Sequence, residues 1–137
     1  MSMFKIFDIA GSGMAAQTVR LNVTASNLAN ADMVSGSPET VYRPRQPVFE
    51  TWMDTMQSDP AVAGVRVSGI AASHVEAQKH YEPGNPSADA DGYVYRANVD
   101  SVQEMVNMMS AARSYQNNIE ILNTTKELLL RTLNVGR

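Results

Sequence analysis

The last third of this 137-residue chain restricts its fold more than any other feature. From about Asp100 to Asn134 the sequence contains neither proline nor glycine, the two residues that most disfavour helix interiors. Asp100, followed by Gln103, fits a helix N-cap because its carboxylate can accept from the free N–H groups of the first turn. Gly136 is the expected stop of this helix. The segment therefore predicts a single helix of about 35 residues, about 50 Å long.

Apart from the position of Lys126, this predicted helix carries apolar side chains at steps of three and four, the pattern of an amphipathic helix. A compact globule of this chain length would be less than roughly 40 Å across, so the helix would protrude from it. Its apolar stripe must then be covered by another element or by another subunit. The stripe comprises Met105, Met108, Ala112, Tyr115, Ile119, Leu122, Leu129 and Leu133, and all of these except Ala112 are expected at a subunit interface.

The N-terminal segment, from about Met3 to Asn30, also lacks proline and is expected to be helical. Its larger apolar residues recur at steps of seven, which is typical of a coiled-coil-like seam. Gly11 and Gly13 each cost a helix interior about 1 kcal/mol, so this helix needs a packing partner. The seam residues expected at a subunit interface are Phe7, Met14, Leu21 and Leu28.

Asparagine is frequent in both predicted helices. One interpretation places these side chains in solvent, and the other has them hydrogen-bond between subunits and fix their register. In the C-terminal helix the choice concerns Asn107, Asn117, Asn118 and Asn123. The interface prediction includes Asn22, Asn27, Asn30, Asn118 and Asn123.

The middle of the chain holds all six prolines, between about Ala31 and Asn98. Tyr42–Phe49 is expected to be extended, and its two prolines limit it to a sheet edge. Val62–Ile70 has the alternation of a strand, and a turn at Asp91-Gly92 should lead into Tyr93–Tyr95. Glu82–Pro86 has the composition of a turn.

These segments predict a mainly α fold. Long N- and C-terminal helices pack as a coiled-coil-like pair, with a small, irregular, β-rich segment between them. The expected divisions are an N-terminal helical arm (1–32), a β/loop middle segment (33–97) and a long C-terminal helix (98–137) that pairs with the first.

The composition argues against several kinds of chemistry. A formal charge of −3 disfavours nucleic-acid binding, and the absence of cysteine excludes disulfides, zinc–thiolate sites and a cysteine nucleophile. His74 and His80 have no recognised metal-ligand spacing. The segment from Ser87 to Asn98 lacks the first and last ligands of a calcium loop. We therefore predict no catalytic residue, no metal site and no cofactor.

The chain lacks an apolar run of the roughly 18 residues that a membrane-spanning helix needs. Asp8 falls where the apolar stretch of a signal peptide would run. No membrane insertion is therefore expected, and composition alone favours a protein that stays in the cytosol.

Several motifs are similar to those of the bacterial flagellar rod and hook protein family. The asparagine-rich segment Leu21–Ala31 resembles the N-terminal signature of that family. It continues as Ala31–Gly36 rather than as the Thr-Pro-Gly-Tyr common in other members, which favours a short, proximal-rod type. The other matching segments are Asp8–Gln17, Arg20, Tyr81–Pro86, Gly92–Val94, Asn98–Asp100, Glu104–Met109, Ala112–Asn118 and Leu122–Thr124.

This resemblance implies a structural subunit of the flagellar basal body. Its terminal helices would pack with those of other subunits into a tube that crosses the periplasm, transmits torque and encloses an export channel. The implied partners are further copies of the chain, other rod proteins, the adapter at the rod base and the flagellar type III export apparatus. Export would proceed without a cleaved signal peptide.

Two other functions stay open at this point. A cytosolic coiled-coil adaptor or export chaperone would also present long helices to partner helices. A small enzyme would need His74 or His80. Purification with basal bodies would separate a rod subunit from the adaptor, and replacing both histidines would test the enzyme.

Overall fold

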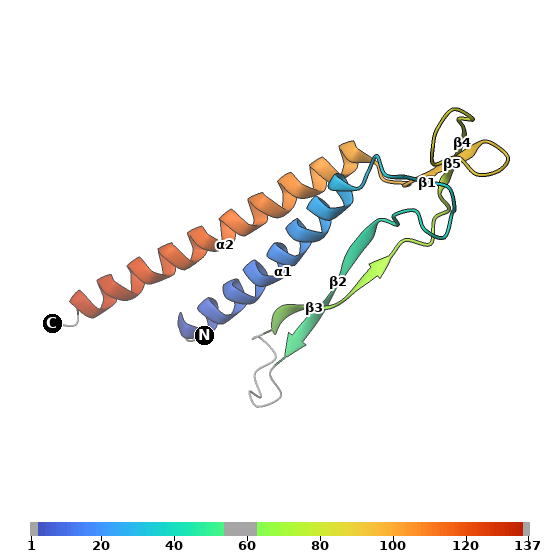
Figure 1. Ribbon diagram of the computed structural model, residues 1–137. Helices are drawn as coiled ribbons and strands as arrows, with labels where there is room; N and C mark the ends of the chain where they lie inside the picture. The colour runs from blue at the N-terminus through green and yellow to red at the C-terminus, as the bar shows by residue number, and fades with distance from the viewer. Residues whose placement is uncertain (1–2, 54–62, 136–137) are drawn as a thin grey trace.

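Two long helices and a β-rich middle make up the fold, as the sequence predicts. The computed structural model describes residues 3–53 and 63–135. Figure 1 shows an elongated molecule in which α1 runs between α2 and a β-hairpin, with a small sheet at one end. The elements are α1 (Met3–Ala29), β1 (Val34–Ser35), β2 (Arg45–Met53), β3 (Ala63–Ala72), β4 (Gln78–Tyr81), β5 (Tyr93–Arg96) and α2 (Ser101–Val135).

The long helix α2 begins where its cap predicts. Asp100 Oδ1 accepts hydrogen bonds from the backbone N–H groups of Val102 (3.0 Å) and Gln103 (3.1 Å), which satisfies two free donors of the first turn. The helix then runs for 35 residues without interruption. The expected stop at Gly136 lies outside the described residues.

Helices α1 and α2 pack antiparallel along their length (Figure 1). Near one end, Asn27 Nδ2 donates to Glu104 Oε2 at 3.1 Å; further along, Gly13 lies against Asn118. Both contacts fit one constant antiparallel offset, which places Met3 opposite Leu128. Since α2 continues to Val135, it overhangs the start of α1 by about 10 Å.

The residues of α1 that face α2 are either small or polar, and none has a large apolar side chain. We call the buried and half-buried residues between the two helices the helix seam. The α2 side of the seam alternates polar or small residues with larger apolar ones at heptad spacing; the coiled-coil geometry itself stays a prediction. The seam comprises Ala10, Gly13, Gln17, Arg20, Thr24, Asn27 and Ala31 from the α1 side, and Glu104, Met108, Ala111, Tyr115, Asn118, Leu122, Thr125 and Leu129 from α2.

Replacing the two glycines of α1 by alanine should have different effects on the free energy of unfolding. A Cβ at Gly13 would lie 2.9 Å from Asn118 Nδ2, whereas a Cβ at Gly11 would meet nothing within 4 Å. Gly11→Ala should therefore raise the free energy of unfolding by about 0.5–1 kcal/mol through helix propensity. Gly13→Ala should lose that gain to the clash and recover it when combined with Asn118→Ala. Urea denaturation of Gly11→Ala, Gly13→Ala, Asn118→Ala and the double variant measures both effects, and equal stabilisation by the Gly11 and Gly13 replacements would contradict this packing.

Strands β2 and β3 form an antiparallel hairpin that packs along α1. Opposite Val48 and Phe49 the register skips Ser68, which forms a β-bulge and donates its hydroxyl to the Val48 carbonyl at 3.2 Å. The hairpin has two strands, so β2 is an edge strand, as Pro44 and Pro47 predict for this segment. The predicted strand at Val62–Ile70 corresponds to β3, although Val62 itself lies outside the described residues.

Side chains of α1 bond to outward-facing backbone groups of this hairpin. Ser12 Oγ accepts from the Val65 N–H (3.2 Å), and Asn27 bonds to both backbone groups of Arg45. In an antiparallel ladder, every second residue points its backbone N–H and C=O away from the partner strand. Arg45 is such a residue, so Pro47, two positions later, is another. The N–H that Pro47 lacks would therefore not have bonded to β3. Polar residues of α1 thus hold the hairpin at two points along the helix.

The end of the molecule away from the α2 overhang is a three-stranded sheet in the order β1-β5-β4. Val94 of β5 is fully buried, and the rings of Tyr81 and Tyr93 meet edge to face with centroids 5.1 Å apart. Lys79 Nζ lies 3.9 Å from the centroid of the Tyr93 ring. The predicted turn before β5 is confirmed: Gly92 has φ +80, and its N–H donates to the Asp89 carbonyl at 3.0 Å.

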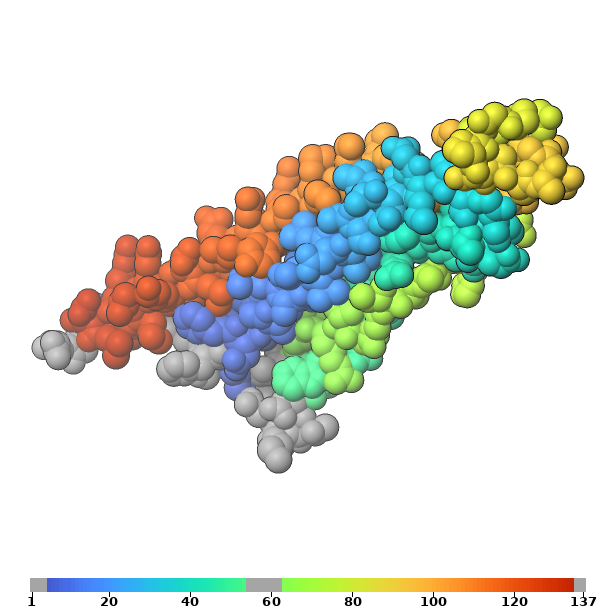
Figure 2. Space-filling model, in the orientation of Figure 1, coloured from blue at the N-terminus to red at the C-terminus, as the bar shows by residue number. Residues whose placement is uncertain are grey.

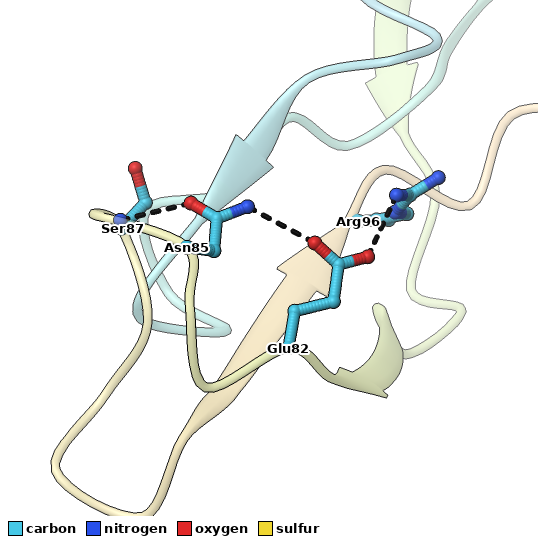
Figure 3. Close-up of polar contacts among 4 residues, drawn as sticks. All are labelled: Glu82, Asn85, Ser87 and Arg96. Carbon is cyan, nitrogen blue, oxygen red and sulfur yellow. Dashed lines mark hydrogen bonds and ion pairs between the residues drawn. The ribbon is translucent and has the colours of Figure 1, made fainter.

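A polar cluster fixes the loop between β4 and β5 (Figure 3). The Glu82 carboxylate accepts from Asn85 Nδ2 (3.0 Å) and Arg96 Nη2 (2.8 Å), and Asn85 Oδ1 accepts from the Ser87 N–H (2.9 Å). The bond from Asn85, then that from Arg96, lowers the pKa of Glu82 below its usual 4.5.

Acid should loosen this loop. A carboxyl group whose pKa is lowered in the folded state stabilises the fold at pH values above its usual pKa. This stabilisation is lost as the pH falls through the lowered pKa. We expect the Glu82 carboxyl to titrate below 4.5 by NMR, and the amides near Asn85 to lose exchange protection over the same range. Glu82→Gln should abolish this response. A midpoint at or above 4.5 would contradict the hydrogen-bond assignment.

Candidate assembly interface

Helix α2 exposes a large part of its apolar surface. Met105 is 51% exposed and Leu133 is 63% exposed, although both belong to the predicted stripe. An uncovered apolar surface of this extent is typical of a protein–protein contact. The exposed large apolar residues of α2 are Val102, Met105, Val106, Met109, Ile119, Ile121, Leu128, Leu130 and Leu133.

Both α1 and α2 carry a row of apolar residues, and the two rows lie on the same side of the helix pair. On α1, the row of Phe7, Met14, Leu21 and Leu28 lies beside the helix seam and is half-buried. In both helices the row follows seam residues by one position: Leu21 follows Arg20, and Ile119 follows Asn118. One position is a rotation of about 100°. Because the helices run antiparallel, this rotation carries both rows to one side, where we name them the outer rows. The outer row of α2 is Met105, Ala112, Ile119 and Leu133.

The structure therefore divides the predicted interface residues into three groups. Asn22, Asn123, Met105, Ile119 and Leu133 are exposed and available for contacts. Asn27 is buried and bonded within its own chain. The remainder are half-buried at or beside the helix seam: Phe7, Met14, Leu21, Leu28, Asn30, Met108, Tyr115, Asn118, Leu122 and Leu129.

Asn27 joins three elements of the fold. Its Oδ1 accepts from the Arg45 N–H (2.9 Å) and the Tyr42 hydroxyl (2.8 Å), and its Nδ2 donates to the Arg45 carbonyl (2.8 Å) and to Glu104 (3.1 Å). These four bonds use the full capacity of an amide side chain, which is only 1% exposed. Asn27 thus connects α1, the base of the hairpin and the first turn of α2.

A second exposed apolar surface lies on the β2–β3 hairpin, which sequence reasoning did not assign to an interface. Trp52 is 45% exposed and Met53 is 56% exposed. The apolar residues of β2 fall in adjacent pairs (Val48-Phe49 and Trp52-Met53) and do not alternate with polar ones, so its sequence gives little sign of an apolar face. The exposed apolar residues of the hairpin are Val48, Phe49, Trp52, Met53 and Ile70.

A hollow of about 370 Å³ lies where α1, α2 and β2 meet. Its lining combines two arginines with a buried carboxylate, that of Glu104, which is 8% exposed. Arg20 Nη2 lies 3.5 Å from Asn107 Oδ1, and the Arg45 guanidinium lies 5.9 Å from the centre of the Tyr42 ring. The lining residues are Arg20, Thr24, Arg45, Gln46, Pro47, Phe49, Glu104 and Asn107.

The two histidines lie exposed in the middle segment. Within residues 3–53 and 63–135, no group of three or more acidic or histidine side chains could hold a metal ion. Within the segment from Ser87 to Asn98, Asp89 Oδ1 accepts from the N–H groups of Asp91 (3.0 Å) and Tyr93 (2.8 Å) and forms a turn. Over those same described ranges, no helix is both long and apolar enough to cross a membrane.

Figure 2 shows an elongated molecule. Its helix pair and its hairpin expose apolar surface, and these features together define a class of protein, an elongated structural subunit. Comparison with known families agrees. Residues 7–36 match the family described as flagella basal body rod protein, and residues 90–135 match the flagellar basal body rod FlgEFG protein C-terminal family.

Full-length relatives define the family more closely. The chain is 54% identical to the flagellar basal-body rod protein FlgC of Salmonella typhimurium strain LT2, over all of both chains. It is 52% identical to FlgC of Escherichia coli O157:H7 and 51% identical to that of Yersinia enterocolitica, again over all of each chain. The chain belongs to the FlgC family of flagellar basal-body rod proteins. It is a structural subunit of the basal body and not an enzyme.

Proposed function

We propose that this subunit assembles through its terminal helices into the proximal part of the rod, as a tube that transmits torque and encloses the export channel. The outer rows carry this proposal. They place Met14 of α1 beside Ile119 of α2, and Leu21 beside Ala112, on one open side of the helix pair, where burial requires a neighbouring subunit.

The partners follow from the same surfaces. Helices of further copies and of other rod proteins would cover the outer rows, and an adapter would meet the subunits at the rod base. On this proposal the subunit reaches the periplasm through the flagellar type III export apparatus, without a cleaved signal peptide. The small and polar α1 side of the helix seam suits this route, since α1 can separate from α2 without exposing large apolar side chains of its own seam.

Isolation of basal bodies from cells that carry a tagged copy of this chain tests the proposal. We expect the tagged chain to remain with the rod after the filament and hook are removed, and cells that lack the gene to stop assembly before the distal rod. Electron microscopy of the same particles should place α1 and α2 along the tube wall. Recovery of the chain only in the cytosol, bound to other export substrates, would support an adaptor or chaperone instead.

A further inference from the structure

The hollow between α1, α2 and β2 presents positive charge that the rest of the described chain does not neutralise. Neither Arg20 nor Arg45 forms an ion pair with a carboxylate in residues 3–53 and 63–135. Arg20 has only a long contact with the Asn107 amide oxygen, at 3.5 Å. An arginine has five N–H donors arranged to fit a carboxylate, so most of the donors of both side chains are free for a ligand.

The position of Arg45 is fixed before any partner arrives. Both of its backbone groups bond to Asn27, and Tyr42, whose ring lies beside the Arg45 guanidinium, bonds through its hydroxyl to the same Asn27. Arg20 precedes Asn27 by seven residues on α1, so it lies on the same face of the helix. A rigid frame reduces the entropy lost when a ligand binds.

The charge of the hollow fits one carboxylate. Two guanidinium groups and the buried carboxylate of Glu104 leave one positive charge at neutral pH. Glu104 accepts a hydrogen bond from Asn27 and forms no ion pair with either arginine within residues 3–53 and 63–135. Pro47 and Phe49 add an apolar wall, which suits the aliphatic part of an aspartate or glutamate side chain.

We propose that this hollow, which we name the arginine hollow, binds the carboxylate of an acidic side chain on a neighbouring rod subunit. The inference rests on the assembly proposed above and adds a specific polar contact to the apolar outer rows. Copies of this chain carry 14 acidic and 11 basic residues, so like subunits have carboxylates to offer. A charge pair partly removed from water also favours one register over others.

Carbodiimide coupling of isolated basal bodies tests the contact directly. This reagent joins an amine to a carboxylate that already touches it, and arginine does not react. Arg45→Lys and Arg20→Lys keep the charge of the hollow and introduce the reactive amine. We expect each variant to assemble and to give an amide between its new lysine and an acidic residue of another rod subunit, identified by mass spectrometry.

Arg43→Lys is the matched control, because Arg43 is exposed two residues from Arg45 and does not line the hollow. It should give no such link. The inference is overturned if the new lysines couple only to Glu104 of their own chain, if they couple to a protein outside the rod, or if Arg43→Lys gives the same product. Failure of the unmodified chain to enter basal bodies would instead reject the proposed function.

Charge reversal gives a second, quantitative measurement. The double variant Arg20→Glu, Arg45→Glu should reduce incorporation into basal bodies at least tenfold, whereas Arg43→Glu should leave incorporation within twofold of the unmodified chain. Circular dichroism of the purified variants separates loss of folding from loss of contact. A correctly folded double variant that assembles normally would overturn the inference.

Discussion

Replacing Asn27 by alanine should lower the free energy of unfolding by about 4 kcal/mol, a large effect for one small polar side chain. The substitution removes four hydrogen bonds and leaves the backbone groups of Arg45, the Tyr42 hydroxyl and the Glu104 carboxylate without that partner. Burial keeps water from replacing the amide fully, so each group bears part of its desolvation cost. Asn27→Asp should be similarly harmful, because it loses both donors and faces Glu104.

Urea denaturation followed by circular dichroism measures this effect, with Asn22→Ala as the control on the same helix. Asn22 is exposed, so its replacement should change stability by at most about 0.5 kcal/mol, in the stabilising direction. In cells, Asn27→Ala should also reduce rod incorporation, since the hairpin and α2 lose their common attachment to α1. Equal effects of the two alanines would show that the Asn27 hydrogen bonds contribute little.

Charges placed in the outer row of α2 should block assembly while leaving the monomer folded. Met105 and Ile119 are 51% and 38% exposed, so Met105→Glu with Ile119→Glu should change the free energy of unfolding by less than about 1–2 kcal/mol. At a packed subunit interface the same carboxylates would be buried without a partner, at a much higher cost. We expect incorporation into basal bodies to fall at least tenfold and motility to be lost.

Asn117→Glu provides the control for the outer rows. Asn117 is exposed and follows Gln116 on the side of α2 that faces away from the helix seam, so it lies apart from Met105 and Ile119. Counting tagged chain in isolated basal bodies compares the variants. If Asn117→Glu prevents assembly as strongly as the double variant does, the contact surface of α2 is not the outer row.

The extent and capping of the helices could be predicted because local chemistry determines them. The absence of proline and glycine defined α2, and Asp100 marked its start within one residue. The hairpin strands and the turn at Gly92 were likewise visible from alternation and turn chemistry. Strands β1 and β4 were not, since each has only two to four residues and is stabilised by pairing with β5.

The packing face of α1 was harder to predict. Heptad spacing selected Phe7, Met14, Leu21 and Leu28, yet the residues toward α2 include Gly13, Arg20 and Asn27. Apolar periodicity cannot distinguish a face buried in the same chain from one buried by another molecule, because both remove the same kind of surface from water. The role of Asn27 could not be predicted for a related reason: its partners are backbone groups, whose positions depend on the tertiary fold.

The overhang of α2 beyond the start of α1 has a mechanical consequence for any end-to-end stack of these subunits. At its N-terminal end α2 is level with α1, since the same offset places Ala29 opposite Val102, so only the C-terminal overhang of α2 is free to lie beside the helices of a neighbouring subunit, as in a lap joint. Along such an overlap a twisting load would pass between subunits as shear. Helix ends that only abut would carry the same load as tension, and abutting ends are the weaker arrangement for a rotating shaft.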